Sequence, residues 1–143
     1  IASEDIGNAD PRALEITLNA SQSQERLGSP EGELALAQAT VYLAVAAKSN
    51  AVYNAYKAVM ADVKALPSYE VPMHLRNAPS KLMKDLDYGK GYKYAHDYPN
   101  NFAQQEFLPI EISNSVYYEP GDNPPELKIK ERLKSLWKDK YGY

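Results

Sequence analysis

The sequence of 143 residues lacks cysteine and has only two histidines, His74 and His96. Without cysteine, disulfide bonds and thiolate metal sites are excluded. Two histidines alone do not complete the four-ligand shell that is typical of structural zinc, so no metal site is expected. Long apolar runs are also absent. The longest, residues 41–47, is too short to cross a bilayer and predicts a buried helical segment, so no membrane partner is expected.

Recognisable catalytic motifs are absent as well. The sequence contains no Walker motif and no Gly-x-Ser-x-Gly elbow, and the Gly-Lys-Gly at residues 89–91 lacks the spacing of a phosphate-binding loop. We therefore assign no catalytic, cofactor-binding or metal-binding residue, and we do not expect these residues alone to form an enzyme. The acidic, polar N-terminal residues do not resemble a signal peptide, and a first residue of Ile suggests a segment of a longer, cytoplasmic protein.

The net charge of the chain is small, but the charged residues are unevenly distributed. The net charge is −3. Residues 1–34 carry seven acidic and two basic residues, whereas residues 71–98 carry five basic and three acidic ones and residues 126–143 carry six basic and three acidic ones. Domains dedicated to nucleic acid are usually basic overall, which this chain is not. Local basic faces that contact DNA remain compatible with this distribution.

Three helices are expected in the first half of the chain, within residues 10–28, 29–48 and 49–67. Asp10 with Pro11, and Ser29 with Pro30, are typical of helix starts, while Gly28 is typical of a helix end. The second helix is apolar nearly all round from Leu34 to Ala47, a pattern that is typical of a central, buried helix. Because the connections are short, we expect successive helices to pack antiparallel.

The second half has a different character. Residues 69–125 contain seven of the ten prolines and form a long irregular segment, with a short helix at 80–86 and weak strand character at 111–120. A last helix is expected after Asn123, with prolines in its first turn and an apolar stripe ending at Leu136 and Trp137. The predicted fold is mainly α: three N-terminal helices, the irregular segment and a C-terminal helix.

The stretch "YGKGYKYAHDYP", residues 88–99, allows two interpretations. Aromatic rings interleaved with lysines can stack on single-stranded bases while the ammonium groups meet phosphates. Alternatively, the tyrosines bury their rings against the helices and the glycines permit tight turns. The candidate contacts for DNA or a partner are Arg76, Lys81, Lys84, Tyr88, Lys90, Tyr92 and Lys93. The residues expected to have a structural role are His74, Asn77, Gly89, Gly91, Tyr94 and His96.

Self-association is a further possibility. The central helices carry more apolar surface than a three-helix unit needs, and twelve tyrosines suit an interface. The irregular segment covering that surface within one chain is the alternative, and the sequence does not separate the two.

Several long stretches resemble one family. They are "IASEDIGNADPRAL" (residues 1–14), "QATVYLAVAAKSNAVYNAY" (residues 38–56), and "VPMHLRNAPSKLMKDLDYGKGYKYAHDYPNNFAQQEFLP" (residues 71–109) with the "YYEP" that follows. They resemble the C-terminal part of the replication-associated recombination protein A family of AAA+ ATPases, whose eukaryotic relatives include the Werner helicase-interacting protein. The resemblance covers nearly the whole chain.

This resemblance implies a helical collar domain, similar to the C-terminal domains of clamp-loader subunits, that holds the ATPase as a homo-tetramer. It implies that residues 1–143 form one domain, with residues 1–9 as the tail of a preceding lid domain. ATP and Mg²⁺ would bind in a nucleotide-binding domain upstream. The parent protein is expected to act on DNA in replication, recombination and repair, near the nucleoid, with single-stranded-DNA-binding protein as a partner.

Overall fold

The computed structural model describes residues 1–138 and 140–143, and within them it contains helices and no strand. The main helices are α1 (Arg12–Leu27), α2 (Glu31–Val45), α3 (Ala51–Ala65), α4 (Lys81–Asp85) and α5 (Pro124–Trp137). Short helical turns are η1 (Ala2–Ile6), η2 (Gly7–Ala9), η3 (Met73–Leu75), η4 (Ala95–Asp97), η5 (Pro99–Asn101) and η6 (Ile110–Ile112). The prediction of a mainly α fold is confirmed.

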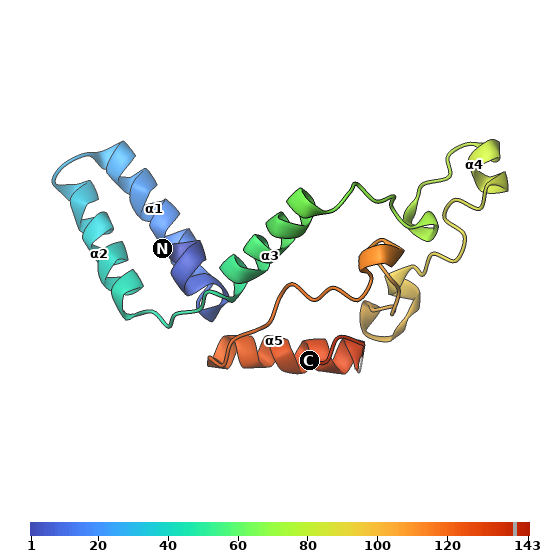
Figure 1. Cartoon of the computed structure of the whole chain (residues 1–143). Helices are drawn as coiled ribbons and strands as arrows, with labels where there is room; N and C mark the ends of the chain where they lie inside the picture. The colour runs from blue at the N-terminus through green and yellow to red at the C-terminus, as the bar shows by residue number, and fades with distance from the viewer. Residues whose placement is uncertain (139) are drawn as a thin grey trace.

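Helices α1 and α2 form an antiparallel hairpin that projects from one end of the molecule (Figure 1). The Asp10 carboxylate accepts a hydrogen bond from the Arg12 N–H at 3.2 Å and so caps the first turn, although α1 begins at Arg12, one residue after the expected Pro11. Gly28 closes the helix with φ +71°, a conformation that favours glycine. The predicted end of this helix is confirmed, and its start lies within one residue of the prediction.

The seam between α1 and α2 is made of small residues. Ala13 and Ala20 of α1 and Gly32 and Ala39 of α2 are the buried residues of the two helices. A Cβ at Gly32 would come within 2.5 Å of the Gln24 Cα, so only glycine allows this close approach. The hairpin thus holds its helices close together but encloses no large side chain.

Helix α3 does not pack against α2, and the expectation that these neighbours would be antiparallel is wrong. The chain leaves α2 in an extended conformation at Ala46, and the Ser49 N–H then donates to the Asp5 carbonyl at 2.8 Å. Helix α3 therefore starts beside the N-terminal turns η1 and η2, against which it packs, and leads away from the hairpin (Figure 1).

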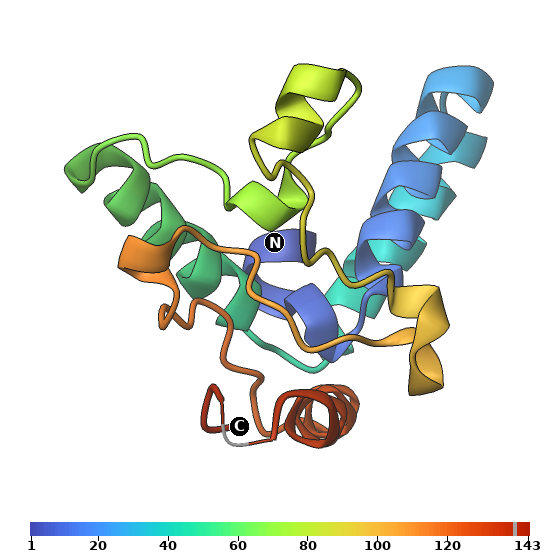
Figure 2. The ribbon, with the colours of Figure 1, turned by 90° about the vertical axis from the view of Figure 1, so that its right-hand side faces the viewer.

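The N-terminal turns form the centre of the molecule (Figure 2). Ile6 is fully buried, and the turns contact α1, α3 and α5. Residues 1–9 thus contribute to the core that the main helices share. Their assignment to the tail of a preceding domain stays a prediction.

The irregular segment follows α3, and its short α-helix, α4, is as expected. The Ser80 hydroxyl accepts a hydrogen bond from the Met83 N–H at 3.2 Å and caps α4. The strand character of residues 111–120 is not realised, because this stretch begins in η6 and then continues without a partner strand among the described residues. Side chains hold it instead: the Tyr117 hydroxyl donates to Asp62 of α3 at 2.8 Å.

Helix α5 begins as the sequence indicates and ends at Trp137. The Asn123 side chain accepts a hydrogen bond from the Glu126 N–H at 3.1 Å, and Pro124 and Pro125 form the first turn. At the other end, Trp137 meets Phe102 edge to face, with ring centroids 5.0 Å apart. This aromatic contact ties the irregular segment to α5.

Candidate interaction surfaces

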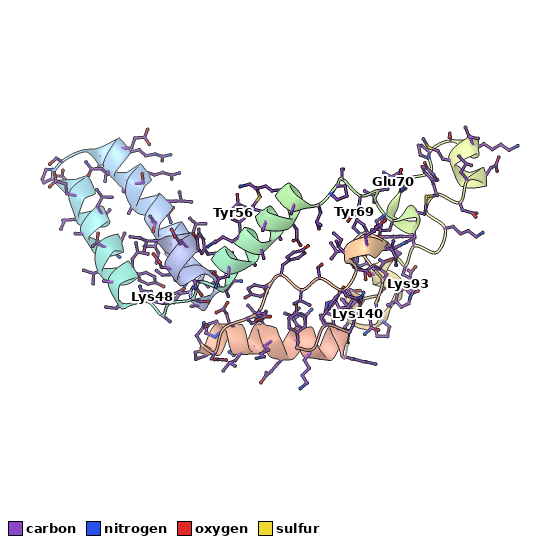
Figure 3. All side chains as sticks on the ribbon, viewed as in Figure 1. Lys48, Tyr56, Tyr69, Glu70, Lys93 and Lys140 are labelled. Atoms are coloured by element: carbon purple, nitrogen blue, oxygen red, sulfur yellow. The ribbon has the colours of Figure 1, made fainter. Side chains whose placement is uncertain are left out.

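The outer side of α2 is an uncovered apolar face, and the expectation that α2 is buried within its own chain is wrong. Leu34, Val41 and Val45 are 74%, 64% and 79% exposed. Helix α2 packs against α1, and the outer side of the hairpin faces no other segment in Figure 3. From Leu34 to Ala47 there is no charged residue. We call the side formed by Leu34, Ala37, Val41, Ala44 and Val45 the α2 face.

A second apolar surface lies along α3. Val59, Val63 and Leu66 form one wall of an open groove of about 490 Å³, and Leu108, Pro109 and Ile112 form the other. The hydrogen bond from Tyr117 to Asp62 lies at its edge and raises the pKa of Tyr117. The groove contains no cluster of charged groups and is therefore suited to apolar contacts.

The whole chain exposes more surface than its size requires. It exposes 10312 Å², whereas a compact monomer of the same mass, 16.0 kDa, exposes about 7,400 Å². The buried apolar residues of the described chain are Ile6 and five alanines. The large apolar side chains that would normally fill a core are mostly at the surface.

Arg76 and Tyr88, two of the predicted contact residues, are engaged with each other. The Arg76 guanidinium lies 5.4 Å from the centroid of the Tyr88 ring, and it donates hydrogen bonds to the Val71 carbonyl at 2.6 Å and to Glu70 at 2.7 Å. The hydrogen bond from Arg76 lowers the pKa of Glu70. Arg76 thus connects residues 70–71, which precede α4, with Tyr88, which follows it.

The predicted lysines lie at the end of the molecule opposite the hairpin, where Figure 3 labels Lys93. Lys81 and Lys84 are exposed on α4. Lys90 pairs with Asp87 at 3.0 Å, and the Lys93 ammonium donates to the Gln104 carbonyl at 2.9 Å. The last two lysines therefore have contacts within the chain.

The tyrosines of the same segment divide into two groups. Tyr88 is half-buried beneath Arg76. Tyr92, Tyr94 and Tyr98 are 52%, 54% and 39% exposed. The expectation that the tyrosines bury their rings against the helices is therefore wrong for these three within the single chain.

The residues predicted to have a structural role make local contacts. The His74 ring is hydrogen-bonded to the Glu106 carbonyl at 2.7 Å, which joins η3 to the later part of the segment. Gly89 and Gly91 have φ of +74° and +83°. The Tyr94 and His96 rings lie 5.0 Å apart. Asn77 is exposed, and the side-chain hydrogen bonds of the described residues do not include it.

One polar cluster was not predicted from the sequence. Glu126, fully buried, accepts hydrogen bonds from the Tyr118 hydroxyl at 2.8 Å and from the Asn123 amide at 2.5 Å, and Tyr118 in turn accepts one from Asn8 at 3.0 Å. Burial raises the pKa of Glu126, but hydrogen bonding with Ser49, Asn123 and Tyr118 outweighs burial, so the pKa is lowered from its ordinary value of 4.5. An acidic residue three positions after the cap Asn123 was the available signal.

No metal or membrane site is found in the part of the chain that the structure describes. No group of three or more acidic or histidine side chains could hold a metal ion there. None of the described helices combines the length and apolarity that crossing a membrane requires.

Comparison with known proteins gives the class of the chain. A family model described as the C-terminal region of the MgsA AAA+ ATPases matches residues 1–137. The chain is 58% identical over 134 residues to replication-associated recombination protein A of Coxiella burnetii and 54% identical over 134 residues to that of Escherichia coli K12, in each case over 93% of this chain. Over 92% of its own length, this chain is 39% identical to ATPase WRNIP1 of Dictyostelium discoideum.

These matches identify the chain as a C-terminal region of the AAA+ ATPases, which are longer proteins. The chain belongs to the MgsA AAA+ ATPase C-terminal family, and the resemblance seen in the sequence is confirmed. It spans about 30% of the length of the bacterial relatives named above and 15% of the Dictyostelium one.

Proposed function

We propose that this chain assembles the subunits of a AAA+ ATPase into a homo-oligomer, as the collar of a tetramer. The observation that carries the proposal is the excess of exposed surface, about 2,900 Å² over a compact chain of equal mass. Exposed apolar side chains contribute to it on both the hairpin and α3. Monomeric proteins rarely leave contiguous apolar patches of more than a few hundred Å² in water.

The excess has the size that stable assembly requires. Obligate interfaces bury about 2,000–5,000 Å² in total and are more apolar than transient ones. In a tetramer each subunit contacts at least two others, so an excess of this order per chain suffices for more than one such interface.

In this proposal the chain contributes positioning, and ATP chemistry with Mg²⁺ belongs to the remainder of the parent protein. The collar would hold the ATPase modules at fixed relative positions, so that nucleotide-driven movements act on DNA together. The relatives named as replication-associated recombination proteins support an action in DNA replication and recombination. We expect the chain alone not to hydrolyse ATP.

Light scattering across a concentration series tests the proposal. The expected result is a molar mass four times the 16.0 kDa of one chain, stable down to micromolar concentration. A mass of one chain at high micromolar concentration would contradict it.

A second candidate function is DNA or partner binding by residues 71–98. The observation that favours it is the exposure of Tyr92, Tyr94 and Tyr98 close to Lys90 and Lys93. Stacking on aromatic rings and phosphate contacts by lysine predict binding of single-stranded DNA that weakens as salt rises.

Charge reversal of two lysines tests this second function. Lys90→Glu with Lys93→Glu is expected to weaken binding to a fluorescent oligonucleotide at least tenfold and to flatten its salt dependence. The control, Lys128→Glu with Lys130→Glu on α5, changes net charge equally and is expected to preserve the affinity. Equal effects of the two pairs, or none, would exclude a site at residues 71–98.

A further inference from the structure

We propose that two copies of the chain pair through the α2 face, with their α2 helices antiparallel around a two-fold axis. This inference rests on the proposed assembly function and specifies which surface makes the contact. Each α2 would then lie between its own α1 and the α2 of the partner subunit. A helix that is apolar nearly all round would be central in the assembly, although it is peripheral in one chain.

The geometry of the α2 face suits this pairing. Leu34, Val41 and Val45 are spaced by seven and four residues, so they lie along one side of the helix, opposite the side that Gly32 and Ala39 turn toward α1. Ala37 and Ala44 lie beside them and let a second helix approach closely, and the exposed Gln38, four residues after Leu34, is the polar side chain of the same side. Because this face carries no charge, two copies of it can meet in an isologous contact without repulsion between like charges.

The charges at the ends of α2 favour an antiparallel direction of the two paired helices. Glu31 and Glu33 lie in its first turn, and Lys48 follows its last turn; Figure 3 labels Lys48 at this end of the hairpin. In an antiparallel pair centred between residues 39 and 40, Leu34 meets the opposite Val45. The acidic first turn of each helix then lies at the C-terminal end of the opposite helix, where Lys48 donates a hydrogen bond to the Leu43 carbonyl of its own chain. A parallel pair would bring like charges together at both ends.

The excess of exposed surface favours a second copy as the occupant of this face. The hairpin buries only small side chains of its own, so its apolar residues gain a core only from outside. An upstream segment of the parent protein is the competing occupant, and so is the α3 groove of a second copy. The experiment separates both from the proposed pair.

Engineered cysteines give a direct test, because the chain has no cysteine of its own. Residues 34 and 45 are eleven positions apart on one helix, about 16 Å, which is too far for a disulfide within one chain. The double variant Leu34→Cys with Val45→Cys is expected to form a disulfide-linked dimer on mild oxidation. The single variants Leu34→Cys and Val45→Cys are the matched controls and are expected to remain unlinked.

The outcomes discriminate between the possible occupants. Linking of each single variant would show a parallel pair and refute the proposed direction. An assembled double variant that does not link would refute pairing through the α2 face but leave the assembly function intact. A wild-type chain that is a monomer by light scattering would refute the assembly function itself.

A charge on the α2 face provides a second readout. Val41→Glu is expected to reduce the molar mass to half that of the wild type or less, with the helical circular dichroism signal retained. The control Gln22→Glu places a glutamate on the exposed side of α1 and is expected to keep the wild-type mass. An unchanged mass for Val41→Glu would refute the inference, since a glutamate cannot be buried in this contact without a large cost.

Discussion

Replacing Glu126 with glutamine tests the reasoning about the buried polar cluster. The carboxylate accepts hydrogen bonds from Tyr118 and Asn123. The side-chain oxygen of Asn123 already accepts a hydrogen bond from the backbone N–H of residue 126. An amide at this position has one oxygen and one NH₂ group. Whichever way it turns, one of its hydrogens faces the hydrogen-bond donor of Tyr118 or of Asn123.

The expected magnitude follows from these two bonds. Hydrogen bonds to charged groups stabilise a folded protein by about 1.5–3 kcal/mol each, and a buried donor left without an acceptor carries a further cost. The variant is relieved of burying a charge, which offsets part of the loss. We therefore expect Glu126→Gln to lower the free energy of unfolding at pH 7 by about 3 kcal/mol.

The effect has a defined pH dependence. The folded-state pKa of Glu126 lies below 4.5, so its carboxylate stabilises the protein above the unfolded-state value and loses this contribution as pH falls through the folded-state value. The difference between wild type and Glu126→Gln should therefore be constant from pH 5 to 7 and shrink below pH of about 4.

Urea unfolding at a fixed protein concentration, repeated from pH 3 to 7, measures both effects. Glu131→Gln on the exposed side of the same helix is the control and should change stability by less than about 0.5 kcal/mol. A loss for Glu126→Gln below about 1 kcal/mol, or one that does not change with pH, would refute the argument that the charged carboxylate holds this cluster together.

Two further predictions concern packing. Gly32→Ala should destabilise the chain by about 1–3 kcal/mol, because the added methyl group would overlap the backbone at Gln24; the urea midpoint measures this, and a stabilised variant would contradict the close approach of α1 and α2. Phe102→Ala should cost about 2 kcal/mol, since it removes one partner of the half-buried Trp137. It should also shift the emission of Trp137, the one tryptophan of the chain, to longer wavelength, and an unchanged spectrum would contradict that contact.

Helix ends were predictable from the sequence because their determinants are local. Asp10, Ser80 and Asn123 each accept a hydrogen bond from a backbone N–H two or three residues later, and no distant residue is needed for that contact. The mainly α class follows from the same local patterns. Packing between helices was less predictable, because the path of residues 46–50 is fixed by the hydrogen bond of Ser49 to Asp5, a contact distant in sequence.

The surroundings of α2 show a different limit of the sequence. An apolar helix indicates that water is excluded from it, but its composition is the same whether the covering surface comes from its own chain or from another. The tyrosines of residues 92–98 pose the same problem, since an aromatic residue suits a core and an interface equally. The structure resolves this only by showing that the irregular segment leaves both surfaces open.

The two halves of the molecule are therefore stabilised in different ways. Around Ile6 and Glu126, the stabilising contacts lie within a single chain. They join residues of the N-terminal turns, the Tyr118 region and α5. The hairpin has a seam of alanine and glycine and an apolar outer side, so in the proposed assembly most of its hydrophobic stabilisation would come from a partner. If that partner is a second copy, folding of the hairpin and assembly are one equilibrium, and the stability of the hairpin rises with protein concentration while that of the Glu126 cluster does not.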